Sequence, residues 1–533
     1  LVIPDSIKTI ENSAFSHCSG FTGLKIGRGL TEINDNVFEH CTRLASLSLP
    51  EWISSIGSNS FDYCSGIRGI LTIPDSVTNL GTSAFSHCSE LAGLSIGHGL
   101  TEINSYSFSN CNGLVSLEIP EWITYIKTNA FSYCSGISGT LKIPDSVTRI
   151  DSFAFSRCSK FNHLIIGHGI TEIVSNVFEY CSGMVSLEIP ESITSIGSNS
   201  FAYCTGIRGT LTIPDSIINL ESYAFTHCSG FSSLNIGHGI KEINRYVFSN
   251  CNGLSSLTIP DWITSIGSYS FSYCSKIRGT LTISDSVTLI DDYAFSFCSG
   301  LTGIKFGQNL TSIGSYVFAN CNGLVSLAIP DWITSIGPYA FSSCTGIRSS
   351  LIIPDSVSKI DRFAFSHCTG ITSVKFGKSI SEINENTFEY CTSLSTLNIP
   401  ETVTTIRSYA FSYCTGIKGA LTIPSSVTRI DSFAFSHCSG FTILNFSSNL
   451  TEVDDNVFEY CSGLSHLEIP ESIHSIRSYA FTQCTGIRGK LTIPDTVTEI
   501  SNYAFSFCSG ITNLEIGHGI TEISSYAFTN CIG

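Results

Sequence analysis

The stretch Leu71-Thr72-Ile73-Pro74-Asp75-Ser76-Val77, followed by Ala84-Phe85 and Cys88, decides the fold because the chain repeats it along its whole length. Leu71, Thr72 and Ile73 alternate between apolar and polar side chains, the pattern of a short strand with one buried face. Pro74 has no N–H to donate to a neighbouring strand, so the strand ends there. We expect each copy of this stretch to form one turn of a larger repetitive structure.

The cysteines measure the length of the repeat. They fall at Cys18, Cys41, Cys64 and so on to Cys531, with spacings of 23, 23 and 24 residues that recur without exception. The 533 residues contain 23 cysteines, one per repeat, and three repeats make a longer period of 70 residues. A constant period in the twenties is typical of a solenoid. Because no linker interrupts the array, residues 1–533 are predicted to form a single solenoid domain of about 23 turns.

Each repeat contains signals for several short elements. Leu24-Lys25-Ile26 is predicted to be a strand, and Leu30-Thr31-Glu32-Ile33 a second, shorter strand that returns along the turn. Phe38, Cys41 and Leu44 follow at intervals of three, which favours a single 3₁₀-like turn over an α-helix.

The remaining signals concern the core. Phenylalanine stands three residues before every cysteine, from Phe15 to Phe528, and predicts a column of stacked rings. The cysteines are interpreted as buried free thiols, with disulfides between turns and metal binding as less favoured alternatives. The 24-residue repeat has its extra residue beside Gly69, where a β-bulge would absorb it.

These repeats resemble the BspA-like, or treponemal-type, leucine-rich repeats. The resemblance rests on the stretch quoted above and on its return at Leu211-Thr212-Ile213-Pro214, Ala224-Phe225 and Cys228, and it covers the whole chain. It implies a right-handed leucine-rich-repeat solenoid with short parallel strands, found on surface or secreted proteins of anaerobic bacteria and protists. Adhesion and protein binding are the activities it implies. This chain departs from the pattern in its strict 70-residue period and in a Gly-x-Gly turn that replaces proline in one repeat of three.

Composition excludes several classes of protein. The net charge of −16 argues against a nucleic-acid partner, which requires a basic surface. Apolar runs never exceed four residues, so no membrane-spanning segment is expected in this chain. Catalysis requires one unique constellation of groups in a pocket, whereas this chain offers the same residue types at regular intervals. We therefore assign no catalytic residue, no cofactor and no metal site.

Histidines alternate with carboxylates in the turn that follows the strand. His98, His168 and His238 each stand one repeat away from an acidic residue on either side, as in the order Asp75, His98, Glu121. Such a column offers ligands for a divalent metal and would respond to pH. Alternatively, a basic or neutral residue relieves repulsion in a column of acids. Arginine, glutamine, lysine and serine occupy the position elsewhere, which favours the second interpretation, and the histidines stay candidates for partner binding.

All four tryptophans share one column. Exposed rings would dock a protein or glycan ligand, about 14 Å apart where adjacent three-turn blocks both carry one. Rings packed over a neighbouring turn would instead cover the edge of the core. Serine or threonine replaces them in equivalent turns, so both interpretations remain open. The four lie in Pro-Glu-Trp-Ile or Pro-Asp-Trp-Ile turns: Trp52, Trp122, Trp262 and Trp332.

Three asparagines begin Asn-x-Ser/Thr sequences and are candidates for glycosylation if the chain is secreted from a eukaryotic cell: Asn309, Asn445 and Asn449.

Two classes of function are compatible with this sequence. The first is a non-catalytic cell-surface or secreted protein that presents an extended face for adhesion or protein binding. The second is a structural protein that assembles with other copies of itself into an extracellular fibre or sheath. The chain begins and ends within a repeat and is expected to be a segment of a longer or polymeric protein.

Overall fold

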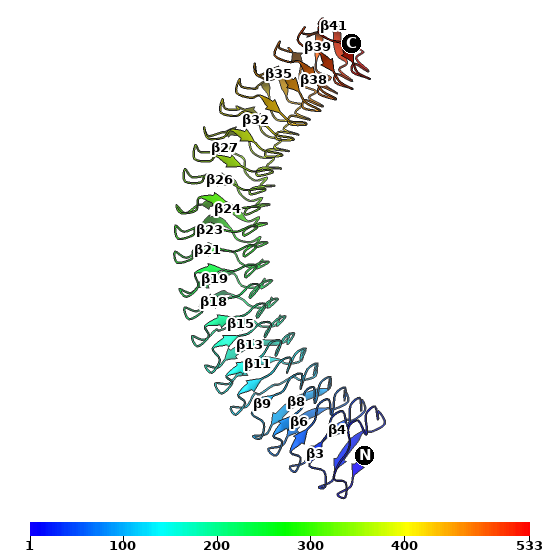
Figure 1. Ribbon diagram of the computed structural model, residues 1–533. Helices are drawn as coiled ribbons and strands as arrows, with labels where there is room; N and C mark the ends of the chain where they lie inside the picture. The colour runs from blue at the N-terminus through cyan, green and yellow to red at the C-terminus, as the bar shows by residue number, and fades with distance from the viewer. Residues whose placement is uncertain (533) are drawn as a thin grey trace. The chain divides into compact units, whose positions relative to one another are not determined.

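The computed structural model describes residues 1–532 and consists of β-strands, turns and bends, with no helix in that range. Contacts divide the chain into two compact units, unit 1 (Leu1–Leu257) and unit 2 (Thr258–Gly533). Each unit is a solenoid of stacked turns (Figure 1), and the chain has about 23 turns. The predicted solenoid of parallel strands is confirmed, while a single domain over residues 1–533 stays a prediction. No helix formed by residues 1–532 has the length and hydropathy that crossing a membrane requires.

The strands form two rows, which we call row A and row B. Row A follows each cysteine by several residues and contains the longer strands. In unit 1 it comprises β1 (Val2–Ile3), β2 (Gly23–Ile26), β4 (Ser46–Leu47), β6 (Gly69–Ile73), β8 (Leu91–Ile96), β11 (Gly139–Ile143), β13 (Phe161–Ile166), β15 (Ser186–Leu187), β17 (Thr210–Ile213) and β19 (Ser233–Ile236). In unit 2 it comprises β22 (Gly279–Thr282), β24 (Leu301–Lys305), β27 (Ser350–Ile352), β29 (Ser373–Lys375), β31 (Thr396–Leu397), β33 (Gly419–Thr422), β35 (Phe441–Asn445), β37 (His466–Leu467), β39 (Arg488–Ile493) and β41 (Gly510–Ile516).

Row B consists of two-residue strands that lie between the Pro or Gly-x-Gly turn and the next phenylalanine. In unit 1 it comprises β3 (Glu32–Ile33), β5 (Ser55–Ile56), β7 (Asn79–Leu80), β9 (Glu102–Ile103), β10 (Tyr125–Ile126), β12 (Arg149–Ile150), β14 (Glu172–Ile173), β16 (Ser195–Ile196), β18 (Asn219–Leu220) and β20 (Glu242–Ile243). In unit 2 it comprises β21 (Ser265–Ile266), β23 (Leu289–Ile290), β25 (Ser312–Ile313), β26 (Ser335–Ile336), β28 (Lys359–Ile360), β30 (Glu382–Ile383), β32 (Thr405–Ile406), β34 (Arg429–Ile430), β36 (Glu452–Val453), β38 (Ser475–Ile476), β40 (Glu499–Ile500) and β42 (Glu522–Ile523).

Both rows pair in parallel with neighbouring turns, and their interruptions follow the 70-residue period. In row B, β3, β5 and β7 form one sheet and β9, β10 and β12 form the next, with no pairing between β7 and β9. At this joint a side chain replaces the backbone donor, because Asn104 Nδ2 donates to the carbonyl of Leu80 at 3.0 Å. Inside a sheet the equivalent donor is a backbone N–H, as from Gly81 to Ile56 at 2.7 Å. The asparagine therefore satisfies a carbonyl that the interrupted ladder would leave free.

The 24-residue repeat contains the predicted β-bulge. Where β6 pairs with β8, the register shifts between Gly69 and Ile70, and Gly69 has a φ of 75°. The same shift occurs at Gly139, Gly279, Gly419 and Gly489. Because this backbone conformation favours residues without a Cβ atom, glycine absorbs the extra residue at little cost.

The core of each unit contains the predicted column of phenylalanine rings. Neighbouring rings are stacked, with centroids between 5.1 Å for Phe61–Phe85 and 5.9 Å for Phe225–Phe248. Beyond the first turn, cysteine thiols donate to the carbonyl of a phenylalanine in the preceding turn; Cys64 Sγ, for example, lies 3.0 Å from Phe38 O. All cysteines except Cys18 and Cys531 are buried, so the predicted burial of the column is confirmed for the others. The thiol is thus both a small apolar group and a donor to a core carbonyl.

The segment before each cysteine forms a third ladder that the sequence analysis did not predict. Hydrogen bonds from residue i+3 to residue i are present, as from the Cys41 N–H to Phe38 O at 3.1 Å, but no 3₁₀-helix forms. The reason is that the residues five and one before every cysteine are left-handed, with φ values from 53° to 65°. This conformation turns their N–H groups toward the next turn: Tyr273 N donates to Ser296 O at 2.8 Å.

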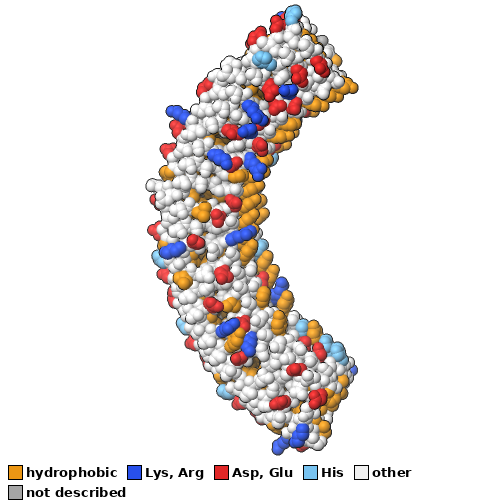
Figure 2. All heavy atoms as spheres, in the orientation of Figure 1, with side chains coloured by type: hydrophobic (Ala, Val, Ile, Leu, Met, Phe, Trp, Pro, Cys, Tyr) orange, Lys and Arg blue, Asp and Glu red, His pale blue; other side chains and the backbone are white. Residues whose placement is uncertain are grey.

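Side chains at these left-handed positions lie outside the core and stack on their counterparts in adjacent turns. Tyr293, Tyr316 and Tyr339 are separated by centroid distances of 4.3 Å, as are Tyr390 and Tyr413. In Figure 2, hydrophobic side chains follow the edge of each unit that lies opposite the strands labelled in Figure 1. Mutual stacking stabilises a backbone conformation that otherwise costs a non-glycine residue free energy.

Row B is also interrupted between β12 and β14, and this place offers a test of the asparagine that bridges the equivalent interruption at Asn104. Val174 stands where Asn104 stands at the equivalent joint and has no amide to donate. Val174→Asn is expected to slow amide hydrogen exchange in the adjoining turns about fivefold, because one added hydrogen bond contributes about 1 kcal/mol. Amide hydrogen exchange is the suitable measurement because it reports local stability, whereas the unfolding of a long repeat array need not be two-state. Val174→Ser is the control, since its hydroxyl is too short to replace the amide; equal protection in both variants would contradict the proposed role.

Alkaline pH tests the thiol column. Burial raises the pKa of the thiol to about 12 in Cys158, Cys228 and Cys321. The folded chain therefore holds protons that the unfolded chain releases above about pH 9. Stability should be fully present below pH 9 and fall between pH 9 and 12, by about 1.4 kcal/mol per pH unit for each such thiol. Thermal midpoints at pH 8 and 10.5 measure the effect. A Cys158→Ala, Cys228→Ala variant should show a shallower dependence, and an identical dependence would refute the assignment.

Candidate functional site

The Gly-x-Gly turn holds its histidine against a carboxylate of the preceding turn. Asp75 Oδ1 accepts the backbone N–H of His98 at 2.8 Å and lies 3.1 Å from His98 Nδ1. A Cβ atom on Gly97 would approach Pro74 C to 2.5 Å, so the lack of a side chain lets these two turns come this close. The same pairing is present in His168–Asp145, His238–Asp215 and His518–Asp495.

Hydrogen bonds from the histidine lower the pKa of the aspartate in each pair. The pKa of Asp75 is lowered chiefly because the backbone N–H of His98 donates to its carboxylate, and secondly because the imidazole does so. On the other side of His98, Glu121 forms an ion pair with Lys142 at 3.0 Å. Asp75 and Glu121 thus each have a partner of their own, as charge relief in a column of acids requires. In the part of the chain that the structure describes, no three His, Cys, Asp or Glu side chains are arranged to hold a metal ion.

The tryptophan rings lie over the Gly-x-Gly turns. Trp122 Nε1 donates to Gly97 O at 3.1 Å, and its indole stacks against the His98 ring with centroids 3.8 Å apart. Trp52 makes the same bond to Gly27 O at 3.1 Å, with the Arg28 guanidinium 5.7 Å from its ring.

Trp332 Nε1 donates to Gly307 O at 2.8 Å, in the same geometry. All four tryptophans are half-buried. The two interpretations of this column are therefore compatible with each other, because each ring covers a turn and still presents part of its surface to solvent.

The three glycosylation candidates are exposed, and their side-chain amides bond to the preceding turn. Asn309 Nδ2 donates to Asp285 O at 2.7 Å, and Asn449 Nδ2 to Ser425 O at 2.8 Å. Asn445 Nδ2 donates to Thr422 Oγ1 at 3.0 Å. Asn309 and Asn449 replace the second glycine of the Gly-x-Gly turn, so the amide is held at the surface of that turn. Their glycosylation stays a prediction.

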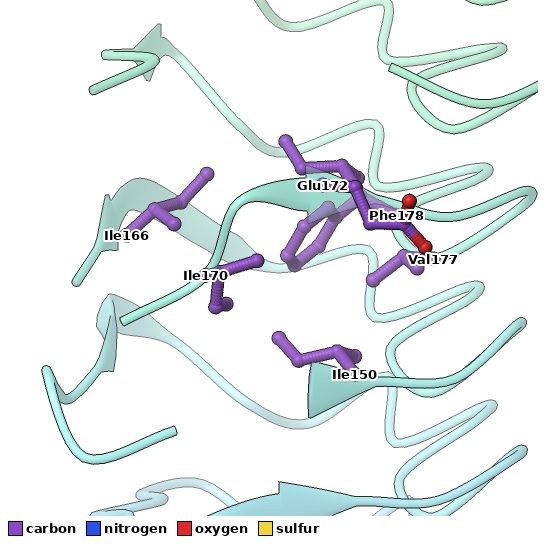
Figure 3. Close-up of a pocket in the computed structure, with 7 residues that line it drawn as sticks. Ile150, Ile166, Ile170, Glu172, Val177 and Phe178 are labelled. Carbon is purple, nitrogen blue, oxygen red and sulfur yellow. The ribbon is translucent and has the colours of Figure 1, made fainter. Parts of the chain in front are cut away.

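The hollow shown in Figure 3 lies just below the surface of unit 1 and has a volume of about 10 Å³. That volume is no more than a single water molecule occupies. It lies beside the joint at which Val174 replaces asparagine, and it brings together no acid, base and nucleophile. Its lining residues are Ile150, Ile166, Ile170, Glu172, Ile173, Val177 and Phe178.

The structure brings the predicted histidines and tryptophans together only in part. His98 contacts Trp122, whereas the turn after His168 has Ser192 in the tryptophan column. His518 was missed by the sequence analysis, although its Gly-His-Gly turn was the signal that identified the others. The outward side chains of row A were also missed, because their pattern becomes visible only once the turns are placed in register.

A family model described as the BspA type leucine rich repeat region matches the whole chain, over residues 1–113, 69–183, 138–229, 209–324, 279–352, 347–420 and 418–533. No curated protein matches the chain in sequence.

Several solved structures are similar to this one. A leucine-rich repeat protein from Bacteroides ovatus is 23% identical, with coverage of 74% of this chain and 87% of that chain and a TM-score of 0.53. A leucine rich cell surface protein from Faecalibacterium prausnitzii is 26% identical, with coverages of 61% and 83% and a TM-score of 0.39. The T. pallidum leucine rich repeat protein is also 26% identical, with coverages of 31% and 78% and a TM-score of 0.29. The first of these shows the same fold.

Trp122→Phe tests whether the indole N–H holds the turn. The variant keeps an aromatic cover but loses the bond to Gly97 O, which is expected to cost about 0.5–1.5 kcal/mol. Amide exchange in the adjoining turns should accelerate accordingly, while turns far along the chain remain unchanged. Ser192→Ala is the matched control, because Ser192 occupies the same column and its hydroxyl has no partner. Unchanged exchange in Trp122→Phe would show that the ring alone stabilises the turn.

Proposed function

This chain belongs to the BspA-type leucine-rich-repeat family, and we propose that it is a non-catalytic protein of the cell surface or extracellular space that binds a protein partner. Its surface consists of columns of residues repeated from turn to turn, and a repeated surface suits an extended ligand rather than a small substrate. The proposal concerns the row of turns that contains the tryptophans and histidines.

The observation that carries this proposal is the fixed, half-exposed position of the tryptophan rings. Because Trp122 is held by a hydrogen bond and by His98, a partner that docks on it would immobilise little further side-chain freedom. Tryptophan is the residue type most enriched where protein interfaces gain their free energy. Exposed charged residues lie near the Trp122 ring, since Glu121 directly precedes it and Asp75 binds the His98 on which it stacks, as in the polar rim of an interface.

A protein partner is favoured over a glycan by the stacking geometry. Sugar rings bind tryptophan by lying on a free face of the indole, and the His98 ring occupies one face of Trp122. At Trp52 the Arg28 guanidinium lies over the ring in the same way. What these tryptophans present is therefore largely an edge and part of one face, which suits insertion between the side chains of a protein.

The test compares a Trp122→Ala, Trp262→Ala variant with the parent chain. Binding to a panel of purified secreted glycoproteins would be measured by surface plasmon resonance, before and after enzymatic removal of their glycans. We expect the double variant to bind its partner at least about tenfold more weakly, because central aromatic contacts carry 2 kcal/mol or more. Ser192→Ala should leave affinity unchanged. Binding that survives the tryptophan substitutions, or that is lost on deglycosylation, would contradict the proposal.

A further inference from the structure

The outward side chains of row A in unit 2 form a basic face on an acidic protein. Between residues 278 and 422 these positions contain no Asp or Glu, although the chain has a net charge of −16. Among the described residues, no carboxylate lies within 4.0 Å of the charged atoms of these cations. All five are exposed: Arg278, Lys305, Arg348, Lys375 and Lys418.

Exposed aliphatic side chains lie among these cations. Val325 is 58% exposed and Ile352 is 56% exposed. The backbone places Val325 next to Arg348, whose N–H donates to Val325 O at 3.3 Å, and Ile352 pairs with Lys375 in the register of β27 and β29. Apolar groups flanked by charges are the composition of a protein interface, whereas an anionic polysaccharide would need only the charges.

Four turns of row A in unit 1, from the turn of Glu118 to the turn of Glu188, are complementary to this face. Glu118 and Glu188 are exposed carboxylates 70 residues apart, and neither lies within 4.0 Å of a described cation's charged atoms. Three aliphatic side chains lie on the same face: Val115 is 54% exposed, Ile165 51% and Val185 43%. Cations also lie on row A of unit 1: Lys142 is paired with Glu121 at 3.0 Å and Arg68 with Glu90, whereas Arg208, one turn beyond Glu188, is exposed.

The two faces have the same spacing because one repeat builds both. Arg278 and Arg348 are 70 residues apart, as are Glu118 and Glu188. Three turns separate the members of each pair, or about 14 Å at the usual distance between parallel strands. Two ion pairs can therefore form at once between an acidic face and a basic face, without either adjusting its spacing.

Strand direction determines which residues meet. Arg278 precedes β22 and Arg348 precedes β27, whereas Glu188 directly follows β15 and Glu118 takes the equivalent position three turns earlier. When two such faces are opposed with their solenoid axes running the same way, the start of one strand lies over the end of the other. Glu118 then faces Arg278, and Glu188 faces Arg348.

In the same register the aliphatic side chains also meet. Val185, which directly precedes β15, faces Ile352 at the end of β27. Ile165 faces Val325 one turn earlier. No charge of one face lies opposite a like charge over these four turns, since Lys142 faces Thr302. Over these four turns every contact is favourable or neutral, whereas the next turn would place Arg208 opposite Lys375, which limits the contact to the four turns.

We propose that two copies of this protein associate by laying the row A face of unit 1 in one molecule on the row A face of unit 2 in the other. The contact is heterologous and lies between different molecules. It is independent of the proposed partner binding, because the residues involved lie in row A and not in the tryptophan turns. The aliphatic pairs supply the desolvated centre, and the two ion pairs set the register.

The test measures self-association of the intact chain by sedimentation velocity. We expect concentration-dependent association that weakens when ionic strength rises from about 0.05 M to about 0.5 M, because the ion pairs are screened. Glu118→Arg with Glu188→Arg should raise the dissociation constant at least about tenfold. Arg278→Glu with Arg348→Glu should do the same. The four substitutions in one chain should restore association, and this restoration distinguishes the proposed pairing from a loss of folding.

The control is a charge change of equal size outside the two faces. Glu51→Arg with Glu471→Arg alters two turn carboxylates and should leave self-association unchanged. The proposal would be overturned if the parent chain stays monomeric at low salt, or if neither charge-reversal variant changes the dissociation constant of self-association. Binding of the monomeric parent to heparin, lost in the Arg278→Glu, Arg348→Glu variant, would instead assign the basic face to an anionic polymer.

Discussion

Each turn donates backbone N–H groups to carbonyls of an adjacent turn, and every other feature of the structure depends on this requirement. A turn of 23 or 24 residues has more polar backbone groups than its own loops can satisfy, so they must be paired with an adjacent turn. The left-handed residues before each cysteine, such as Tyr269 and Tyr273, turn their N–H groups along the solenoid for this purpose. Where the row B ladder is interrupted, an asparagine side chain such as Asn104 takes over.

This requirement also explains which residues the repeat can vary. A core residue must keep its size and its hydrogen-bond donor. Stacked phenylalanines such as Phe61 and Phe85, and thiols such as that of Cys64, which donates to Phe38 O, therefore recur from turn to turn with little change. The outward positions are free, since their side chains contribute little to pairing between turns. Columns whose residue changes from one 70-residue block to the next are therefore the places in which function can differ along the chain, and the columns of Trp122 and Glu188 are of this kind.

The two proposed interfaces use different sides of the same turns. Trp122 lies in the turn that follows row A and is held by the backbone of the preceding turn, whereas Glu118 and Val115 lie on the row A face itself. Because the two sides share no side chain, partner binding and association between copies can occur together. In the second interface the charges on both faces are separated by the same 70-residue period, so their spacings match in every copy of the chain.

The amino-acid sequence by itself determined the solenoid, its period, the phenylalanine column, the buried cysteines and the bulge beside Gly69. Each of these follows from spacing and from side-chain type, which a repeated sequence displays many times. The tertiary structure decided the rest. Left-handed φ angles at Tyr269 or Tyr293 had no signal, because tyrosine does not favour that conformation and adopts it only to bond to the next turn. The position of Trp122 depends on a carbonyl of Gly97, 25 residues away, and the charged faces of row A depend on the register between turns. These are contacts between turns, and a pattern within one turn does not reveal them.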